Sequence, residues 1–259
     1  MDFYIVFKAS FGVEFIEMAY SKDYFELQLK FAEKVSKISK QTLAEVLLNY
    51  TSFYKTFRIE GWEFNVKDPT WTIFINHLQE SDEPLETIYE FYLKQINKKA
   101  LKNEKKMFGC FSYELEEKDK CISIHFRNVD SPEPGALSKE RITVRKTELK
   151  EMFTEIREKH PQLTSVCGFS WLYTIAAYTR LFPPEYIVKS NVINDWFKST
   201  ALWGQFLDSS GNVKRDLVHR FEENIKKAKN LKDLKESFPL KLLEVSAPIK
   251  YLFKFYGIK

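Results

Sequence analysis

Polar side chains alternate with apolar ones between Cys121 and Val129, and they are well placed to do chemistry. In CISIHFRNV, Ser123, His125 and Arg127 occupy every second position, so an extended chain holds all three on one face. A histidine on such a face suits general-base catalysis, because imidazole exchanges a proton near neutral pH. The alternative interpretation is that this face meets solvent or a neighbouring element and has no catalytic role.

A second group of candidates lies in TSVCGFSWLYTIAAYTRLFPP, residues 164–184. Its first ten residues predict a strand buried on both faces, followed by a short helix that the double proline ends. Ser170 and Tyr173 lie near the end of this strand, at the kind of strand-to-helix junction where sheets often build sites. Gly168 indicates a bulge or a close approach. Nothing nearby in sequence activates Cys167, which we expect to be a buried structural thiol.

The composition is that of a folded protein and gives little support to nucleic-acid binding. The chain has 259 residues, of which 44% are hydrophobic and 16% aromatic. The net charge of +4 is the balance of 40 basic and 36 acidic residues. The lysine-rich runs at 98–106 and 226–235 contain acids and no interleaved aromatic residues, which argues against base stacking.

The cysteines and histidines give no metal or disulfide pattern. The three cysteines are an odd number at wide spacing, and the four histidines are scattered, so we expect no metal site and a reducing compartment. No segment approaches the ~18 apolar residues of a membrane span. The first residues are a poor signal peptide. These observations favour a soluble cytoplasmic protein that does not enter a membrane.

Helical spacing dominates the chain up to about residue 97. A helix is expected over 11–19, with a strand as the alternative, and further helices follow as far as a break at Gly61. Asp68 and Pro69 predict the N-cap and first position of the next helix. We therefore expect a mostly helical N-terminal region at 1–103.

From residue 104 onward the pattern predicts a mixed α/β region, 104–259. A hairpin of strands 107–115 and 121–129 with a five-residue loop leads through DSPEPGAL to a long helix that ends at His160. The strand and short helix of 164–184 follow. A further strand is expected over 202–207, where Trp203 and Gln205 are candidate ligand contacts. The predicted fold class is α+β, with the helical region packed on a mixed sheet with flanking helices.

The order of elements from Phe108 to about residue 220 resembles the C-terminal half of the GNAT acyltransferase fold. Three pieces carry the resemblance: SIHF followed by a proline/glycine loop and ALS, then the strand ending in SWLY, then LFPPEYI. The resemblance implies that the strands 121–129 and 164–173 splay apart and that acyl-CoA lies between them. It also implies transfer of an acyl group to an amine of a small molecule or protein.

The roles that the resemblance implies fall on both strands and on the loop between them. His125, Ser170 and Tyr173 would deprotonate the amine, polarise the carbonyl and protonate the leaving thiolate. The usual glycine-rich phosphate loop, Q/R-x-x-G-x-G/A, is replaced here by VDSPEPGALSKERI. A non-catalytic interaction module that keeps the fold is therefore the alternative. The expected acyl-CoA contacts are Phe126, Arg127, Gly135, Ala136, Ser138 and Arg141, and the expected substrate contacts are Trp171, Trp203 and Gln205.

Overall fold

The computed structural model divides the chain into two compact units. We call them the sheet unit, made of 1–6, 103–193 and 240–259, and the helical unit, made of 7–102 and 194–239. Residues 194–239, expected within the α/β region, thus group with the helices of the N-terminal region. The structure describes residues 4–8, 13–17, 19–59, 64–98, 106–116, 120–130, 133–194 and 196–259.

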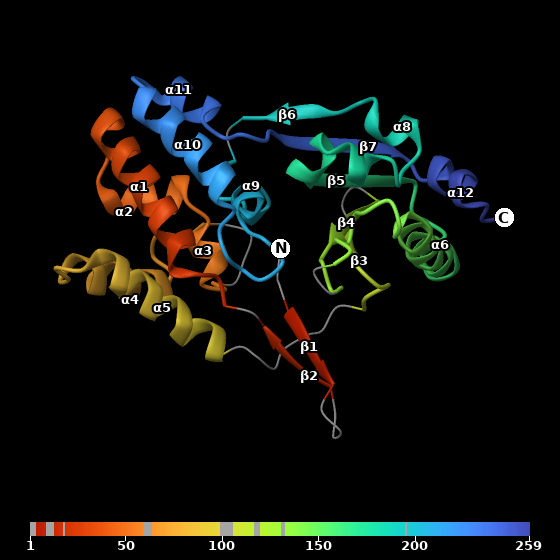
Figure 1. The fold of residues 1–259 in the computed structure, drawn as a ribbon, viewed down its shortest axis with the longest axis horizontal. Helices are drawn as coiled ribbons and strands as arrows, with labels where there is room; N and C mark the ends of the chain where they lie inside the picture. Colours follow the sequence, from red (N-terminus) through yellow and green to blue (C-terminus); the bar gives the residue numbers. More distant parts are fainter. Residues whose placement is uncertain are drawn as a thin grey trace. The chain divides into compact units, whose positions relative to one another are not determined.

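The helical unit contains the helices between residues 22 and 98 and those of the segment between the last two strands (Figure 1). The predicted start of α4 is confirmed: Pro69 is its first residue, and the Asp68 carboxylate accepts from Thr70 N at 2.8 Å and Trp71 N at 3.1 Å. The break expected at Gly61 lies outside the described residues. The helices are α1 (Lys22–Ser39), α2 (Leu43–Tyr50), α3 (Phe53–Thr56), α4 (Pro69–Gln79), α5 (Pro84–Lys98), α9 (Thr200–Trp203), η3 (Gly204–Phe206), α10 (Arg215–Lys227) and α11 (Leu231–Glu236).

An aromatic core joins the two segments of the helical unit. The Phe31 ring of α1 lies 5.4 Å from Trp203 and 5.6 Å from Phe221, and both partners are fully buried. The strand expected over 202–207 is wrong, because this run forms α9 and η3. The Ser199 hydroxyl caps the first turn, and helical turns bring Trp203 and Phe206 into the same core.

The sheet unit is built on a five-stranded mixed sheet, which confirms the α+β class. The strand order is β3-β4-β5-β7-β6, with β4 and β5 parallel and every other pair antiparallel. The strand β7 was not predicted from the sequence of residues 240–248, LKLLEVSAP, in which only Pro248 was given a role, as the start of the last helix. The elements are β3 (Phe111–Glu116), β4 (Cys121–Phe126), α6 (Ile142–Lys159), β5 (Ser165–Ser170), η2 (Trp171–Thr174), α7 (Ala176–Thr179), α8 (Pro184–Ile187), β6 (Asn191–Ile193), β7 (Leu242–Pro248) and α12 (Lys250–Tyr256).

The predicted hairpin is confirmed. Its register is shifted by one residue from the register that the predicted five-residue loop would give. Glu116 pairs with Cys121, and Tyr113 with Ile124. A loop of 116–120 would have paired Leu115 with Cys121 and set the apolar side chains of β3 beside the polar ones of β4. Since a one-residue slip moves every side chain to the other face, burial of one common apolar face selects the observed register.

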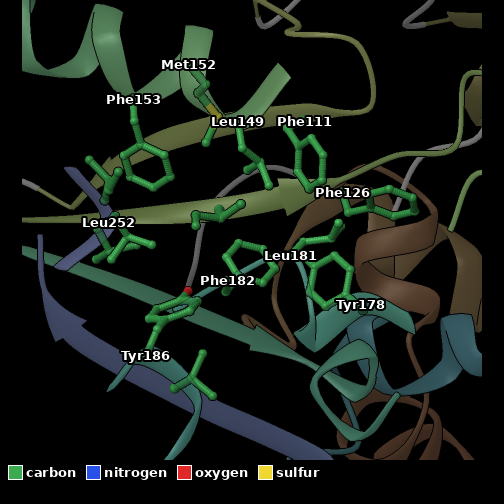
Figure 2. Packing of buried hydrophobic residues seen from close by; sticks show 14 of the residues in the cluster. Phe111, Phe126, Leu149, Met152, Phe153, Tyr178, Leu181, Phe182, Tyr186 and Leu252 are labelled. Atoms are coloured by element: carbon green, nitrogen blue, oxygen red, sulfur yellow. The ribbon is translucent and has the colours of Figure 1, made fainter. Parts of the chain in front are cut away.

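The two faces of the sheet differ in chemistry. The apolar face packs against α6, α8 and α12 in one continuous core, part of which Figure 2 shows. We define the polar face by the alternating residues of the five strands that point the other way. The polar face consists of Ser112, Glu114, Glu116, Cys121, Ser123, His125, Ser165, Cys167, Phe169, Asn191, Glu244 and Ser246, together with three apolar residues at its β6–β7 side and its end, Ile193, Leu242 and Pro248.

A separate two-stranded sheet lies near the start of the chain. It pairs β1 (Tyr4–Lys8) with β2 (Val13–Glu17). The helix expected over 11–19 is therefore wrong, and the strand that we held as the alternative is present at 13–17. None of the helices that the structure describes is long and apolar enough to cross a membrane.

Candidate functional site

The candidate site is the point where the two parallel strands stop pairing. The paired residues end at Ser123 of β4 and Cys167 of β5, although β4 continues to Phe126 and β5 to Ser170. We call this region, residues 124–126 with 168–170, the fork. Strand ends that no longer bond to each other leave backbone groups able to bond to an inserted ligand.

His125 lies in the fork and on the polar face. Its Nε2 atom is 2.8 Å from the Oε2 atom of Glu114 on the neighbouring strand β3, and both side chains are partly exposed. The two groups are within ion-pair distance, although the geometry at Nε2 is not that of a hydrogen bond. A carboxylate beside an imidazole favours its protonated form, which suits a group that is to accept a proton. Sequence analysis missed Glu114, although the correct hairpin register would have placed it diagonally opposite His125.

The charges on the polar face are all of one sign. Glu114, Glu116 and Glu244 contribute three carboxylates, while the face, as defined above, includes no lysine or arginine. Glu116 and Glu244 are exposed to solvent. Such a surface attracts cations, including protonated amines, and repels phosphate groups.

Tyr173 is on the opposite side of the sheet from His125. Its hydroxyl lies over Gly168 and is 3.0 Å from the hydroxyl of Tyr186. A Cβ atom at position 168 would lie 2.5 Å from the Tyr186 hydroxyl and closer still to that of Tyr173, so glycine is required by this close approach. Burial raises the pKa of Tyr173 well above its ordinary value, which keeps the phenol protonated.

Ser170 and Trp171 have structural contacts at the end of β5. The Ser170 hydroxyl accepts a hydrogen bond from Leu172 N at 3.1 Å and caps η2. Trp171 is buried in the core of the sheet unit. In this structure the hydroxyl of Ser170 therefore stabilises a helical turn, and its role toward a carbonyl stays a prediction.

The loop between β4 and α6 is fixed by buried ion pairs. Arg145 Nη2 lies 2.8 Å from Asp130 Oδ2 and 3.1 Å from Glu148 Oε1, and the Arg145 side chain is only 1% exposed. Arg141 contacts the same Asp130 oxygen at 3.1 Å and donates to Pro134 O at 3.1 Å. The loop is thus held by arginine contacts to a carboxylate and to its own backbone.

The other predicted loop contacts are placed around this network. Ala136 is buried, and Gly135 is exposed with no atom within 4 Å of the position that a Cβ would take. Ser138 N donates to Gly135 O. Arg180, which sequence analysis did not consider, donates from Nη2 to Leu137 O at 2.6 Å. The backbone of Arg127 bonds to Cys110 O at 2.8 Å, beside the loop.

Two predicted substrate contacts lie in the helical unit and not at the fork. Trp203 and Gln205 are both 0% exposed. The indole of Trp203 donates to Phe197 O at 2.8 Å, and the Gln205 amide donates to Leu202 O at 2.8 Å. These contacts give both residues a role in the core. In the sequence, the mixture of polar and aromatic residues at 202–207 suggested a ligand contact, but this run forms helical turns.

Cys167 is a partly buried thiol on the polar face, next to Cys121 on the neighbouring strand. Both sulfur atoms approach the carbonyl oxygen of Ile122, at 3.2 Å for Cys167 and 3.4 Å for Cys121. The hydrogen bond with Cys121, together with burial, raises the pKa of Cys167. A thiol that holds its proton is a poor nucleophile, in agreement with the structural role expected from the sequence.

Comparisons of the chain with protein-family models, with curated proteins and with solved structures found no match. In the part of the chain that the structure describes, no group of three or more histidine, cysteine, aspartate or glutamate residues could hold a metal ion.

Proposed function

We propose that this chain transfers an acyl group from acyl-CoA to an amine, with the reaction at the fork. The observation that carries the proposal is the early end of pairing between the parallel strands β4 and β5. In sequence, β4 comes before the long helix α6 and β5 comes after it. The resemblance to GNAT acyltransferases implies a splay between these two strands, and the register supports it.

The residues on the two sides of the fork suit the two proton transfers. The imidazole of His125 takes a proton from the attacking amine, and the Glu114 carboxylate, 2.8 Å from its Nε2 atom, stabilises the imidazolium that forms. The protonated phenol of Tyr173 is the proton donor for the departing sulfur. Acyl-CoA supplies the thioester: the amine nitrogen bonds to the carbonyl carbon, the carbon–sulfur bond breaks, and the sulfur leaves as a thiol.

The phosphate end of the ligand would meet the start of α6. A helix of 18 residues carries a partial positive charge at its N-terminus, and Arg141 and Arg180 lie beside it. Two buried nitrogens of Arg145, Nε and Nη1, have no hydrogen-bond partner among the described residues. This excess of donors fits an anion, although Pro132 and Pro134 supply no backbone N–H groups to the loop.

The alternative is an interaction module without catalysis, and the loop favours it. Two loop carbonyls, of Pro134 and Leu137, are occupied by arginine side chains. A loop held in this way is stable without a ligand. Calorimetry separates the two proposals, since only the acyltransferase needs to bind CoA.

The test is a titration of CoA and acetyl-CoA into the wild-type chain and into Gly135→Asp. Because a side chain at Gly135 meets open space, this variant folds and places one negative charge at the loop. The acyltransferase proposal expects micromolar binding that weakens at least about tenfold in Gly135→Asp, since like charges at the loop repel. Absence of binding at millimolar CoA would leave the interaction module as the better account.

A further inference from the structure

Basic side chains gather where α6 packs against α12 in the sheet unit. The two helices lie side by side (Figure 1), and the ring of Phe153 on α6 stacks on that of Tyr256 on α12 at 5.4 Å. Lys146, Lys150 and Arg157 are spaced i, i+4 and i+11 along α6, so they share one side of this helix. Lys146 and Arg157 both reach aromatic rings of α12, which means that this side of α6 faces α12.

The cations of this surface have no acidic partners. Lys250 and Lys254 of α12 are exposed, and the chain has no aspartate or glutamate from 245 to 259. Among the residues that the structure describes, neither these two lysines nor the three cations of α6 take part in an ion pair. The exposed acids of α6, Glu151 and Glu158, lie on another side of that helix. A surface of this kind attracts polyanions.

Aromatic rings are interleaved with these cations. The sequence of residues 250–259 is KYLFKFYGIK. The Nζ atom of Lys146 lies 5.0 Å from the centre of the Phe255 ring, and the guanidinium carbon of Arg157 lies 5.3 Å from the centre of the Phe253 ring. Phe255 is 38% exposed, although phenylalanine is usually buried. We call the following residues the basic-aromatic surface: Lys146, Lys150, Arg157, Lys250, Lys254 and Phe255.

The chemistry of this surface fits a single-stranded nucleic acid better than a membrane. A helix that lies on a bilayer inserts its apolar face, but the apolar face of α12, with Leu252 and Tyr256, is buried in the core of the sheet unit. The lysine-rich runs at 98–106 and 226–235 argued against nucleic acid because they contain acids and no interleaved aromatic residues. The segment 250–259 has the aromatic residues and lacks the acids, which is the combination that contacts phosphates and stacks on bases.

We propose that the basic-aromatic surface binds single-stranded nucleic acid. The lysines contact backbone phosphates, and the Phe255 ring stacks on one base. The planar guanidinium of Arg157, held by its bond to Ile258 O at 3.2 Å, offers a second place for a base to stack. Stacking and phosphate contacts do not read base edges, so binding is tolerant of sequence and sensitive to salt. This proposal is independent of the acyltransferase proposal.

The first test measures the fluorescence anisotropy of labelled oligo(U) and oligo(dT) with the full chain, and of a duplex of the same length. We expect a Kd of about 1–100 µM for the single strands at physiological salt, as is usual where bases are not read, and weaker binding of the duplex. Phe255→Leu is expected to weaken single-strand binding about fivefold or more, the low end for one stacked base. Phe255→Tyr keeps the ring and should bind like the wild-type chain.

The second test separates this surface from the overall charge of the chain. Two double variants each remove two exposed lysine charges: Lys150→Gln with Lys254→Gln on the basic-aromatic surface, and Lys229→Gln with Lys232→Gln in the other lysine-rich run. Because each phosphate contact contributes about 0.7 to the slope of log K against log salt, we expect the first pair to make the slope shallower by about 1.4. The second pair should leave the slope unchanged.

Three results would overturn the proposal. One is the absence of single-strand binding at protein concentrations well above the expected Kd. Another is equal weakening by the two double variants together with wild-type affinity in Phe255→Leu, which would mean that net charge alone attracts the strand. The third is binding to vesicles of phosphatidylserine and phosphatidylcholine without binding to either oligonucleotide, which would identify the surface as one for anionic lipid.

Discussion

His125 and Tyr173 lie on opposite faces of the sheet, and the proposed reaction assigns one proton transfer to each residue. On the polar face, the Nε2 atom of the imidazole lies 2.8 Å from the Glu114 carboxylate. The phenol is buried among tyrosines on the apolar face, where its pKa is raised.

Replacing the proposed base is expected to lower the rate more than the affinity. We predict that His125→Ala lowers kcat for acetyl transfer to a primary amine by about 10²–10⁴-fold, the usual contribution of a general base. Glu114→Gln is expected to cost about 10-fold, because it removes the carboxylate charge that lies 2.8 Å from the imidazole and stabilises its protonated form. Release of CoA thiol measures both rates. Glu116→Gln, exposed on the same strand, is the control, and full activity of His125→Ala would contradict the assignment.

Gly168 is a residue at which a single methyl group should be costly. A Cβ there meets the hydroxyls of Tyr173 and Tyr186, so we predict that Gly168→Ala lowers the free energy of unfolding by about 1–3 kcal/mol. Gly135→Ala, which meets open space, is expected to change it by less than about 0.5 kcal/mol. Chemical denaturation measures both variants, and equal stabilities would show that the tyrosines do not constrain this position.

At the scale of elements, the β4–α6 loop is fixed by a network that links three parts of the sheet unit. Asp130 lies in the loop, Arg145 and Glu148 lie on α6, and Glu148 accepts from Cys110 N, just before β3, at 3.2 Å. Gly109 adopts φ +57°, and a side chain there would meet the Glu148 carboxylate. The position of the loop therefore depends on the first two turns of α6 and, through Glu148, on Cys110 before β3.

Removing the centre of this network should destabilise the sheet unit. Arg145→Met removes the buried charge that Asp130 and Glu148 share, and leaves Asp130 with Arg141 and Glu148 with the Cys110 N–H. We therefore predict a loss of about 3 kcal/mol near neutral pH, the lower end for a broken buried pair. Burial raises the pKa of Glu148, which means that the folded chain binds this proton more tightly than the unfolded chain. The loss of stability in Arg145→Met is therefore expected to shrink as the pH falls through the folded-state pKa of Glu148, because the protonated carboxyl no longer needs the arginine charge.

Denaturation of Arg145→Met at pH 7 and at pH 5 measures this effect. Arg157→Met is the matched control on the same helix, because Arg157 is on the exposed side, where it donates to Ile258 O at 3.2 Å. We expect the control to lose less than about 1 kcal/mol, as is usual for exposed groups. A loss in Arg145→Met that grows at pH 5 would contradict the role assigned to Glu148.

The sequence predicted what periodicity and capping determine locally. The N-cap at Asp68, the end of α6 at Lys159 with His160 as C-cap, and the alternation around His125 were all read correctly. The strand expected over 202–207 was wrong, because a short apolar run suits a strand or a buried helix equally well. Glu114 was missed because hairpin register depends on which face is buried, and that is decided by the rest of the core.

At the scale of the whole molecule, the helical unit is assembled from two segments of the chain. In sequence, residues 103–193 of the sheet unit lie between them. Residues 194–239 lie in sequence between the adjacent strands β6 and β7, yet they group with 7–102. The contact of Phe31 with Trp203 joins these segments inside one aromatic core. No local pattern predicts such an arrangement, because it depends on contacts between residues more than 150 positions apart.

This arrangement predicts a long-range effect of one core substitution. Trp203→Ala is expected to cost about 3–5 kcal/mol and to weaken hydrogen-exchange protection in α1, far away in sequence. Protection in β4 and β5 is the internal control and should change less. Exchange followed by mass spectrometry provides the measurement. Unchanged protection of α1 would mean that the two segments do not form one core.

The most direct test of the account is a hydrogen-exchange footprint of acetyl-CoA on the wild-type chain. If the fork holds the acyl-CoA, slower exchange is expected in two places, residues 124–127 at the end of β4 and residues 133–141 in the loop before α6. The helices α1 and α10 should exchange at the same rate with and without the ligand. An acyl-CoA site at the fork would be contradicted if saturating acetyl-CoA slowed exchange only in the helical unit, or did not slow exchange in any part of the chain.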